Sequence, residues 1–184
     1  MDGLTGKLLI AIPELGDPNF YRSVVLVMMH GEEGATGIIL NRPSNATVSS
    51  VWDQISDLEC ECDDAVHVGG PVEGPLMALH TSLAAAERQI LPGVFLTMQR
   101  EHLNQLVAQD EHEFRIYSGY AGWSPGQLEA EIERGGWLLR EAAFEHVFEA
   151  NEEALWKMVC EHLGHDIMLP HFNQNRNFID PGMN

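Results

Sequence analysis

The sequence predicts an α+β fold, a single domain in which helices flank a curved sheet that is mostly antiparallel or mixed. Short apolar runs come in pairs around turn residues, as residues 23–29 and 35–40 do around a Gly-Glu-Glu-Gly loop, and this spacing is typical of β-hairpins. Single helical patterns follow the hairpins instead of alternating with each strand, which disfavours a doubly wound parallel sheet. The 184 residues contain no repeat or linker-like stretch, so one domain is the simplest organisation.

Individual elements follow from local patterns. Alternating or continuous apolar runs predict strands, and Pro13 and Pro43 end two of them because proline cannot donate to the ladder. Apolar residues spaced by three and four predict helices, and Thr47 and Asn151 are good N-caps for the first and the last. The predicted strands are 7–12, 23–29, 35–40, 66–68, 76–80, 89–91 and 94–97, and the predicted helices around them cover 48–55, 100–109 and 152–163.

The stretch from Arg115 to Leu139 has the most detailed pattern. Alternation at its start predicts a strand, and Gly119 and Gly122 predict a tight turn after that strand. Ser124 is then the expected N-cap of a helix, with proline at the first helical position and Gln127 completing a Ser-x-x-Gln capping box. A glycine pair ends this helix, and a further strand follows.

The chain is strongly acidic, because 28 Asp and Glu against ten Lys and Arg give a formal net charge of −18. Such a surface repels phosphate backbones and anionic membranes, so neither nucleic acid nor membrane is an expected partner. No secretory signal is visible, and the longest apolar run, residues 24–29, is far too short to cross a bilayer. Three cysteines, an odd number, predict free thiols in a reducing cytoplasm.

Several motifs and single residues, taken in order along the chain, carry a family resemblance. They are Leu8–Ala11, Phe20 with Ser23–Leu26, Gly37–Pro43, Gly69–Val72 and Gly119–Glu129, together with Trp137, Leu155 and Trp156. This set resembles the AlgH/YqgE family of bacterial proteins. The resemblance implies a small cytosolic α+β domain over residues 1–164, with no established catalytic residues, and some members carry the label of transcriptional regulator without a recognised DNA-binding motif. The polar tail, residues 165–184, lies beyond the resemblance and is expected to be loosely held.

Patterns that would indicate catalysis, a cofactor or a metal are weak. His162, His165 and His171 approximate a metal cluster, but a glycine would end the helix between the first two, so no metal site is predicted. Cys60 and Cys62 lie among acidic residues, which raise the pKa of a thiol and disfavour a redox role. No catalytic residue and no cofactor is therefore predicted.

One combination leaves a ligand site open as a hypothesis. Asn41 and Arg42 leave the end of a strand, and the glycine-rich turn presents the free amides of a helix start, so together they would bind a phosphate or a carboxylate. The alternative is that Arg42 pairs with a surface carboxylate and that the glycines only permit the turn. The residues of this hypothetical ligand site are Asn41, Arg42, Gly119, Gly122, Trp123, Ser124 and Gln127.

We therefore expect a non-enzymatic cytoplasmic regulatory or interaction domain that acts through a protein partner or a small anionic ligand. The alternative is a small-anion sensor, or an enzyme, that uses a pocket near Arg42 and the helix start at Ser124. A deep pocket that contains Arg42 or Trp123 would favour the alternative, whereas a flat apolar patch would favour the interaction domain.

The charge yields a first prediction. With a net charge of −18 and no helix dense in Lys or Arg, the protein should not bind duplex DNA tightly at physiological salt. A fluorescence-anisotropy titration should detect no sub-micromolar affinity. A tight, salt-sensitive complex would contradict the prediction and would support the regulator label in its literal sense.

Overall fold

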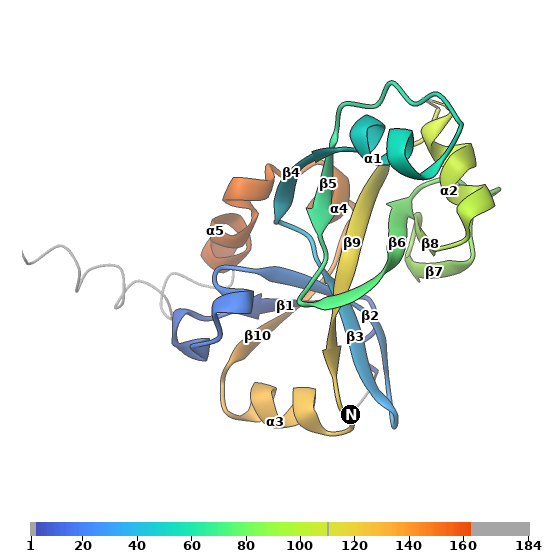
Figure 1. Cartoon of the computed structure of the whole chain (residues 1–184). Helices are drawn as coiled ribbons and strands as arrows, with labels where there is room; N and C mark the ends of the chain where they lie inside the picture. The colour runs from blue at the N-terminus through green and yellow to red at the C-terminus, as the bar shows by residue number, and fades with distance from the viewer. Residues whose placement is uncertain (1–2, 110, 163–184) are drawn as a thin grey trace, which may run out of the picture.

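A computed structural model describes residues 3–109 and 111–162, which form ten strands and five α-helices (Figure 1). The strands are β1 (Lys7–Ala11), β2 (Val24–Gly31), β3 (Gly34–Ile39), β4 (Pro43–Thr47), β5 (Ala65–Val68), β6 (Val72–His80), β7 (Arg88–Leu91), β8 (Val94–Thr97), β9 (Phe114–Trp123) and β10 (Trp137–Glu141). The helices are α1 (Val48–Ile55), α2 (Arg100–Val107), α3 (Gln127–Glu133), α4 (Phe144–Phe148) and α5 (Glu152–His162), with short 3-10 turns η1 (Pro13–Leu15) and η2 (Pro18–Phe20). The predicted α+β class with a curved, largely antiparallel sheet is confirmed.

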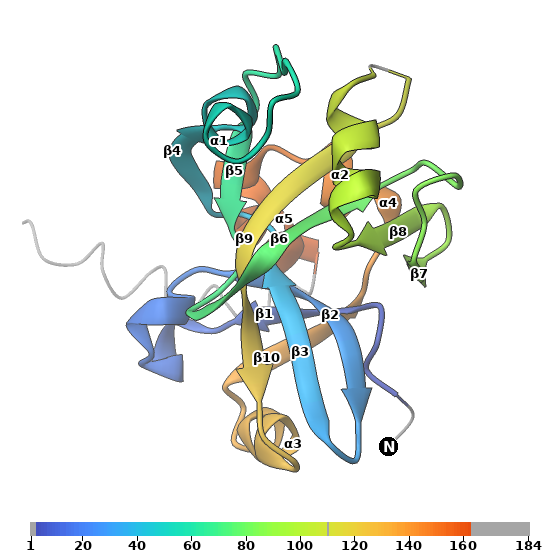
Figure 2. The same cartoon turned by 45° about the vertical axis from the view of Figure 1, so that its right-hand side comes forward.

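Strand β9 is the central strand of the sheet and lies between β3 and β6. The order of the strands is β10-β1-β2-β3-β9-β6-β8-β7. The last residues of β9 pair with β3, as Trp123 does with Ala35, while its first residues pair with β6, as Arg115 does with Leu79. Strand β5 joins β9 in parallel, and β4 pairs with β5. Because β9 runs through both halves of the molecule, the sheet curls around it instead of lying flat (Figure 2).

One glycine pair, Gly69 and Gly70, meets the centre of β9 at Gly119 and Tyr120. A Cβ on Gly69 would lie 2.2 Å from the carbonyl oxygen of Gly119, and a Cβ on Gly70 would lie 2.1 Å from the carbonyl carbon of Tyr120. The segment that links β5 to β6 therefore passes with its backbone directly against β9, which only glycine permits. The predicted tight turn at Gly119 and Gly122 is wrong, because β9 continues through both glycines to Trp123.

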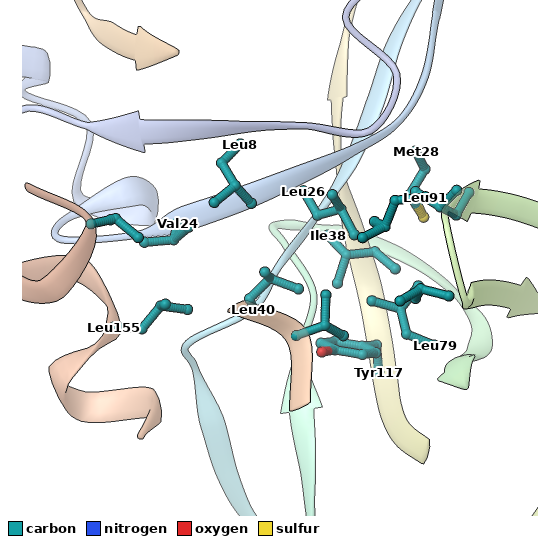
Figure 3. Packing of buried hydrophobic residues seen from close by; sticks show 14 of the residues in the cluster. Leu8, Val24, Leu26, Met28, Ile38, Leu40, Leu79, Leu91, Tyr117 and Leu155 are labelled. Atoms are coloured by element: carbon teal, nitrogen blue, oxygen red, sulfur yellow. The ribbon is translucent and has the colours of Figure 1, made fainter. Parts of the chain in front are cut away.

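Buried side chains form three clusters on the faces of this sheet. The largest lies inside the curl, where helix α5 covers it, and Figure 3 shows Leu8 and Leu26 facing toward Leu79 and Tyr117 in this cluster. A second cluster on the outer face of β1–β3 includes Phe20, Trp123, Leu128 and Trp137. The third packs α1 and α2 on the sheet and includes Trp52, Leu106 and Ile116. The indole of Trp156 in α5 also donates to the carbonyl of Ala11 at 2.8 Å.

The predicted helix starts are confirmed for α1 and α5 and are wrong in part for α3. The hydroxyl of Thr47 accepts from the amide of Ser50 at 3.2 Å, and the side chain of Asn151 accepts from the amide of Ala154 at 3.1 Å. Helix α3 instead begins after Gly126, whose φ of 74° is left-handed. Ser124 supplies its amide, not its hydroxyl, which accounts for half of the predicted capping box.

The predicted C-terminal helix, residues 152–163, is present over the part of the chain that the structure describes. Helix α5 is described to His162, and Leu155 and Val159 are buried on its inner face as predicted. Residues 163–184, including the predicted tail, lie outside the described residues. No helix within residues 3–109 and 111–162 has the length and apolar character needed to span a bilayer.

The two glycines of β9 give a matched pair of substitutions. Gly119 has a φ of 74°, and an added Cβ would lie 2.8 Å from the carbonyl oxygen of Val72, whereas a Cβ on Gly122 would meet nothing closer than 3.5 Å. Gly119→Ala should lower the free energy of unfolding by about 1–3 kcal/mol, and Gly122→Ala by much less. Urea unfolding measures both, and equal losses would contradict the assigned backbone conformation.

Candidate functional site

An apolar hollow of about 440 Å³ lies where the curled sheet opens, between the β2–β3 hairpin and strands β6 and β8. We call it the mouth. Its wall consists mainly of Met28, Met29, Met77, Leu96, Met98 and Tyr120. Met28 and Met77 form a nearly buried floor, with 5% and 3% of their surface exposed, whereas Met29 and Met98 are 44% and 46% exposed. Methionine is flexible and polarisable, so such a lining adapts to apolar surfaces of different shapes.

A β-bulge explains why two consecutive methionines line the mouth. Neighbouring side chains of a regular strand point to opposite faces of the sheet. In the β2–β3 pair, Val27 pairs with Gly37 and Met29 pairs with Thr36, so Met28 is an extra residue on β2. This bulge turns both Met28 and Met29 toward the same hollow.

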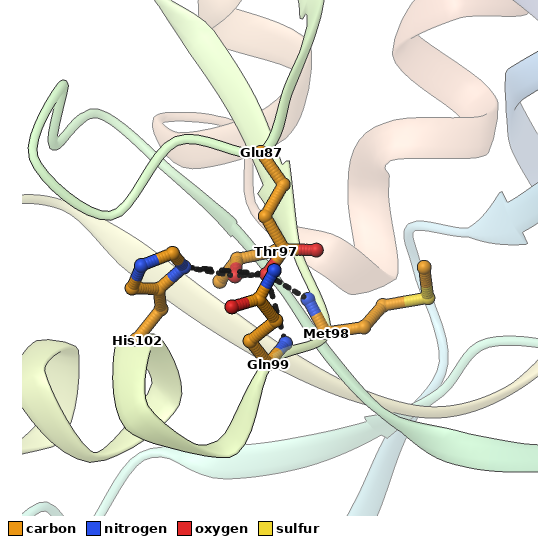
Figure 4. A network of polar contacts seen from close by, with 5 residues as sticks. All are labelled: Glu87, Thr97, Met98, Gln99 and His102. Carbon is orange, nitrogen blue, oxygen red and sulfur yellow. Dashed lines mark hydrogen bonds and ion pairs between the residues drawn. The ribbon is translucent and has the colours of Figure 1, made fainter.

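The carboxylate of Glu87 fixes the opposite rim of the mouth (Figure 4). It accepts from the amides of Met98 at 3.0 Å and Gln99 at 2.8 Å, and also from the hydroxyl of Thr97. His102 contacts the same carboxylate at 3.3 Å. Burial alone would raise the pKa of Glu87, but these hydrogen bonds outweigh it and lower the pKa. Glu87 thereby holds the backbone segment that leads into helix α2 and carries Met98.

A second hollow, of about 540 Å³, lies beside Trp123 and brings part of the predicted ligand site together. Gly122, Trp123 and Gln127 line it. The indoles of Trp123 and Trp137 donate to one oxygen of Glu131 at 3.0 and 2.8 Å, and Gln127 donates to the other oxygen at 2.9 Å. The Glu131 carboxylate therefore organises an aromatic wall of Trp123 and Trp137, of which the sequence pattern indicated Trp123 alone.

The charge of this second hollow differs from the predicted anion site. Glu14, Asp17 and Glu131 line it, and Arg134 is the one cation among the described lining residues. Helix α3 is also only seven residues long, so its free amides contribute little dipole. Carboxylates at these positions favour a cation over the phosphate or carboxylate that the sequence predicts.

The other predicted site residues lie elsewhere and have partners within the fold. The side chain of Asn41 accepts from the amide of Val24 at 2.8 Å and donates to the carbonyl of Arg22 at 2.9 Å. Arg42 donates to the carbonyl of Asn19 at 2.6 Å, and burial lowers the pKa of its guanidinium. Both side chains thus hold the loop between η2 and β2. Gly119 lies where the Gly69–Gly70 segment passes against β9. Neither Gly119 nor Ser124 lines the second hollow.

Two buried polar groups, His80 and Tyr117, had no signal in the sequence pattern. His80 is fully buried beside Phe95, and neither ring nitrogen meets a hydrogen-bond partner at normal geometry in the described chain. Burial, with a smaller effect of His102, lowers the pKa of His80 to about 4. The hydroxyl of Tyr117 is likewise buried without a partner in this part of the chain, and burial raises its pKa.

A buried ionic contact fastens helix α5 to the sheet. Glu152 lies 2.7 Å from the imidazole of His67 in β5 and 3.1 Å from the guanidinium of Arg115 in β9. Arg115 also donates to the carbonyl of Phe148 at 3.2 Å. One carboxylate therefore links two strands to the C-terminal helices, and removal of one partner would leave an uncompensated charge in a partly buried position.

The cysteines and histidines of the sequence analysis have mainly structural surroundings. Cys60, although it lies among acidic residues in the sequence, is buried in the cluster under α1 and α2. Burial raises the pKa of Cys62, and the pKa of Cys160 is raised to about 11 for the same reason. Within residues 3–109 and 111–162, no three His, Cys, Asp or Glu side chains gather as metal ligands. His165 and His171 lie outside the described residues.

Comparisons of the sequence with known proteins point to one family. A family model described as AlgH-like matches residues 8–168. The UPF0301 protein of Myxococcus xanthus is 38% identical over 170 residues, which cover 90% of this chain and 94% of the relative. The UPF0301 protein of Ruegeria pomeroyi is 39% identical and covers 90% of this chain and 95% of the relative.

Solved structures have the same fold. The solution structure of the AlgH protein from Pseudomonas aeruginosa superposes with a TM-score of 0.76 and 30% identity, covering 92% of this chain and 94% of that protein. A crystal structure of a protein from Corynebacterium diphtheriae has a TM-score of 0.74 and covers 92% of each chain. At 22% identity, the second likeness concerns the fold alone.

The buried His80 predicts a loss of stability in mild acid. Its pKa falls from 6.5 in the unfolded chain to about 4 in the folded one, so the unfolded state binds the proton first as the pH falls below 6.5. Between about pH 7.5 and pH 5, the free energy of unfolding should fall by about 2 kcal/mol through this group. Urea unfolding should find this loss in the parent and in the exposed-site control His112→Asn, but not in His80→Phe. An unchanged acid loss in His80→Phe would contradict the assignment.

Proposed function

This chain belongs to the AlgH-like family, and on that premise we propose that it is a non-enzymatic binding domain whose methionine-lined mouth takes apolar side chains of a protein partner. The observation that carries the proposal is the exposure of Met29 and Met98 above a floor of Met28 and Met77. Methionine-rich apolar linings are common at surfaces that bind several different partners, because the side chain adapts its shape. The cytoplasm, with its reducing conditions, fits the three free cysteines.

The lining of the mouth supports binding more than chemistry. Glu87 is the only carboxylate among its described lining residues, and amide donors already occupy that carboxylate. The remaining polar groups of the lining are Thr36, Arg88 and the phenol of Tyr120. A general base and a nucleophile within hydrogen-bond reach of each other would be needed for acid–base or covalent catalysis. Four methionines, in contrast, provide an apolar surface that can adapt to a partner.

The alternative proposal, a small-ligand sensor, applies to the hollow beside Trp123. Its volume of about 540 Å³ lies in the range of small-molecule sites, and it has an aromatic wall. The intramolecular hydrogen bond of Arg42 to Asn19 and the three lining carboxylates give less support to an anion there. We therefore rank this hollow below the mouth.

Loss of the two rim methionines tests the proposal. The double variant Met29→Ser, Met98→Ser should bind the neutral apolar dye Nile red roughly tenfold more weakly, because about 1.4 kcal/mol of apolar contact is lost. Ile55→Ser, which changes a 45% exposed apolar residue on α1, is the matched control and should bind the dye as the parent does.

Methionine methyl NMR locates the dye. The signals of Met28, Met29, Met77 and Met98 should shift on titration, whereas the signal of Met158 on α5 should not. Equal dye binding by both variants, or shifts that leave the mouth methionines unmoved, would overturn the proposed function.

A further inference from the structure

Building on the proposed function, we infer that the occupant of the mouth is a basic amphipathic helix of a protein partner. Its apolar face inserts between Met29 and Met98, and its Lys and Arg side chains face carboxylates outside the apolar hollow. Three features of the molecule carry this inference: the charges around the mouth, the charge of the whole chain, and the covered edge of the sheet beside the mouth.

Exposed glutamates stand at the ends of the strands that form the mouth. Glu32 and Glu33 form the turn of the β2–β3 hairpin, a few residues beyond Met29. Glu73 lies in β6, close before the segment that lines the hollow. Among the described lining residues Glu87 and Arg88 balance in charge, so the negative charge near the apolar centre comes from the glutamates that lie beyond the lining on the same strands and their turn. A helix with one apolar and one basic face complements this arrangement.

The charge of the whole chain narrows the choice of occupant. At −18, a second copy of this chain would be repelled, and so would nucleic acid and anionic membrane surfaces. A neutral small molecule would gain nothing from the acidic rim. A basic partner, in contrast, is attracted over a long range before the apolar contact forms.

The edge of the sheet beside the mouth disfavours an added strand. The sheet ends on this side at β7, whose Arg88 lines the mouth. A Cβ on Gly6 would lie only 2.9 Å from the carbonyl oxygen of Ile90, so the N-terminal segment passes directly against β7. A partner strand would have to displace this segment, whereas a helix can place side chains three and four apart into a hollow without touching the edge.

Three synthetic peptides of equal length test the inference. The first is an amphipathic Leu/Lys helix, the second replaces every Lys with Glu, and the third replaces every Leu with Ser. Fluorescence anisotropy at low salt should find the Leu/Lys peptide bound at least tenfold more tightly than either of the others. Its affinity should fall as salt is added, because the rim charges are exposed. Only this peptide should shift the methyl signals of Met28, Met29, Met77 and Met98.

A pair of matched variants separates the rim from the overall charge. Glu32→Gln, Glu33→Gln, Glu73→Gln removes three charges at the mouth, and Glu59→Gln, Glu61→Gln, Asp63→Asn removes three at the acidic hollow beside Cys62. The rim variant should bind the Leu/Lys peptide about fivefold or more weakly than the control variant does. Equal weakening in both would overturn the rim as the determinant.

The outcomes for the two proposals are distinguishable. If the Leu/Glu peptide binds as tightly as the Leu/Lys peptide, the mouth binds apolar segments without regard to charge, and this inference falls while the proposed function stands. If Nile red shifts the signals of the mouth methionines but no peptide does, the occupant is a small apolar ligand. This result would contradict both the basic helix and the protein partner of the proposed function. If neither the dye nor any peptide shifts these signals, both proposals fall.

Discussion

The fold depends on the contact between two backbones at the centre of β9. Gly69 and Gly70 pass so close to Gly119 and Tyr120 that a Cβ on either of the first two would overlap β9. This contact lets β5 join β9 in parallel and β6 return along it in the antiparallel direction. The half of the sheet that contains β1–β3 and the half that contains β6–β8 are consequently held to one strand, and the sheet must curl.

The curl creates both the main core and the mouth. Inside it, side chains from both halves pack on each other and on α5, and at its open end the same surface continues as exposed methionine. The bulge at Met28 adds one more apolar side chain to this end than a regular strand would supply. The mouth is thus the uncovered end of the core, which explains why its lining is apolar although the chain is acidic.

Much of the fold could be predicted because its signals are local. Paired apolar runs gave the hairpins, and Thr47 and Asn151 gave two helix starts, since a cap acts within three residues. The turn predicted at Gly119 is wrong because this position needs glycine for its contact with a distant segment, Gly70–Val72, and a tight turn would need glycine for a local reason that looks the same in the sequence. Ser124 failed as a cap because Gly126 adopts the left-handed conformation and delays the helix. The mouth had no local signal at all, since its methionines come from three separate segments of the chain.

The mouth combines an ordered backbone with flexible methionine side chains, and a site that adapts to its ligand needs both. Glu87 shows how the frame is made: its carboxylate binds successive amides and so holds the backbone of Met98 while leaving the thioether free to move. On the opposite side, the ladder between β2 and β3 holds Met29 in the same manner. The backbone of the proposed site is therefore ordered in the protein alone, and only side chains with shallow rotamer preferences would need to adjust on binding. A site of this kind would lose little conformational entropy on binding, so modest apolar contact supported by nearby charges would be enough to hold the proposed partner reversibly.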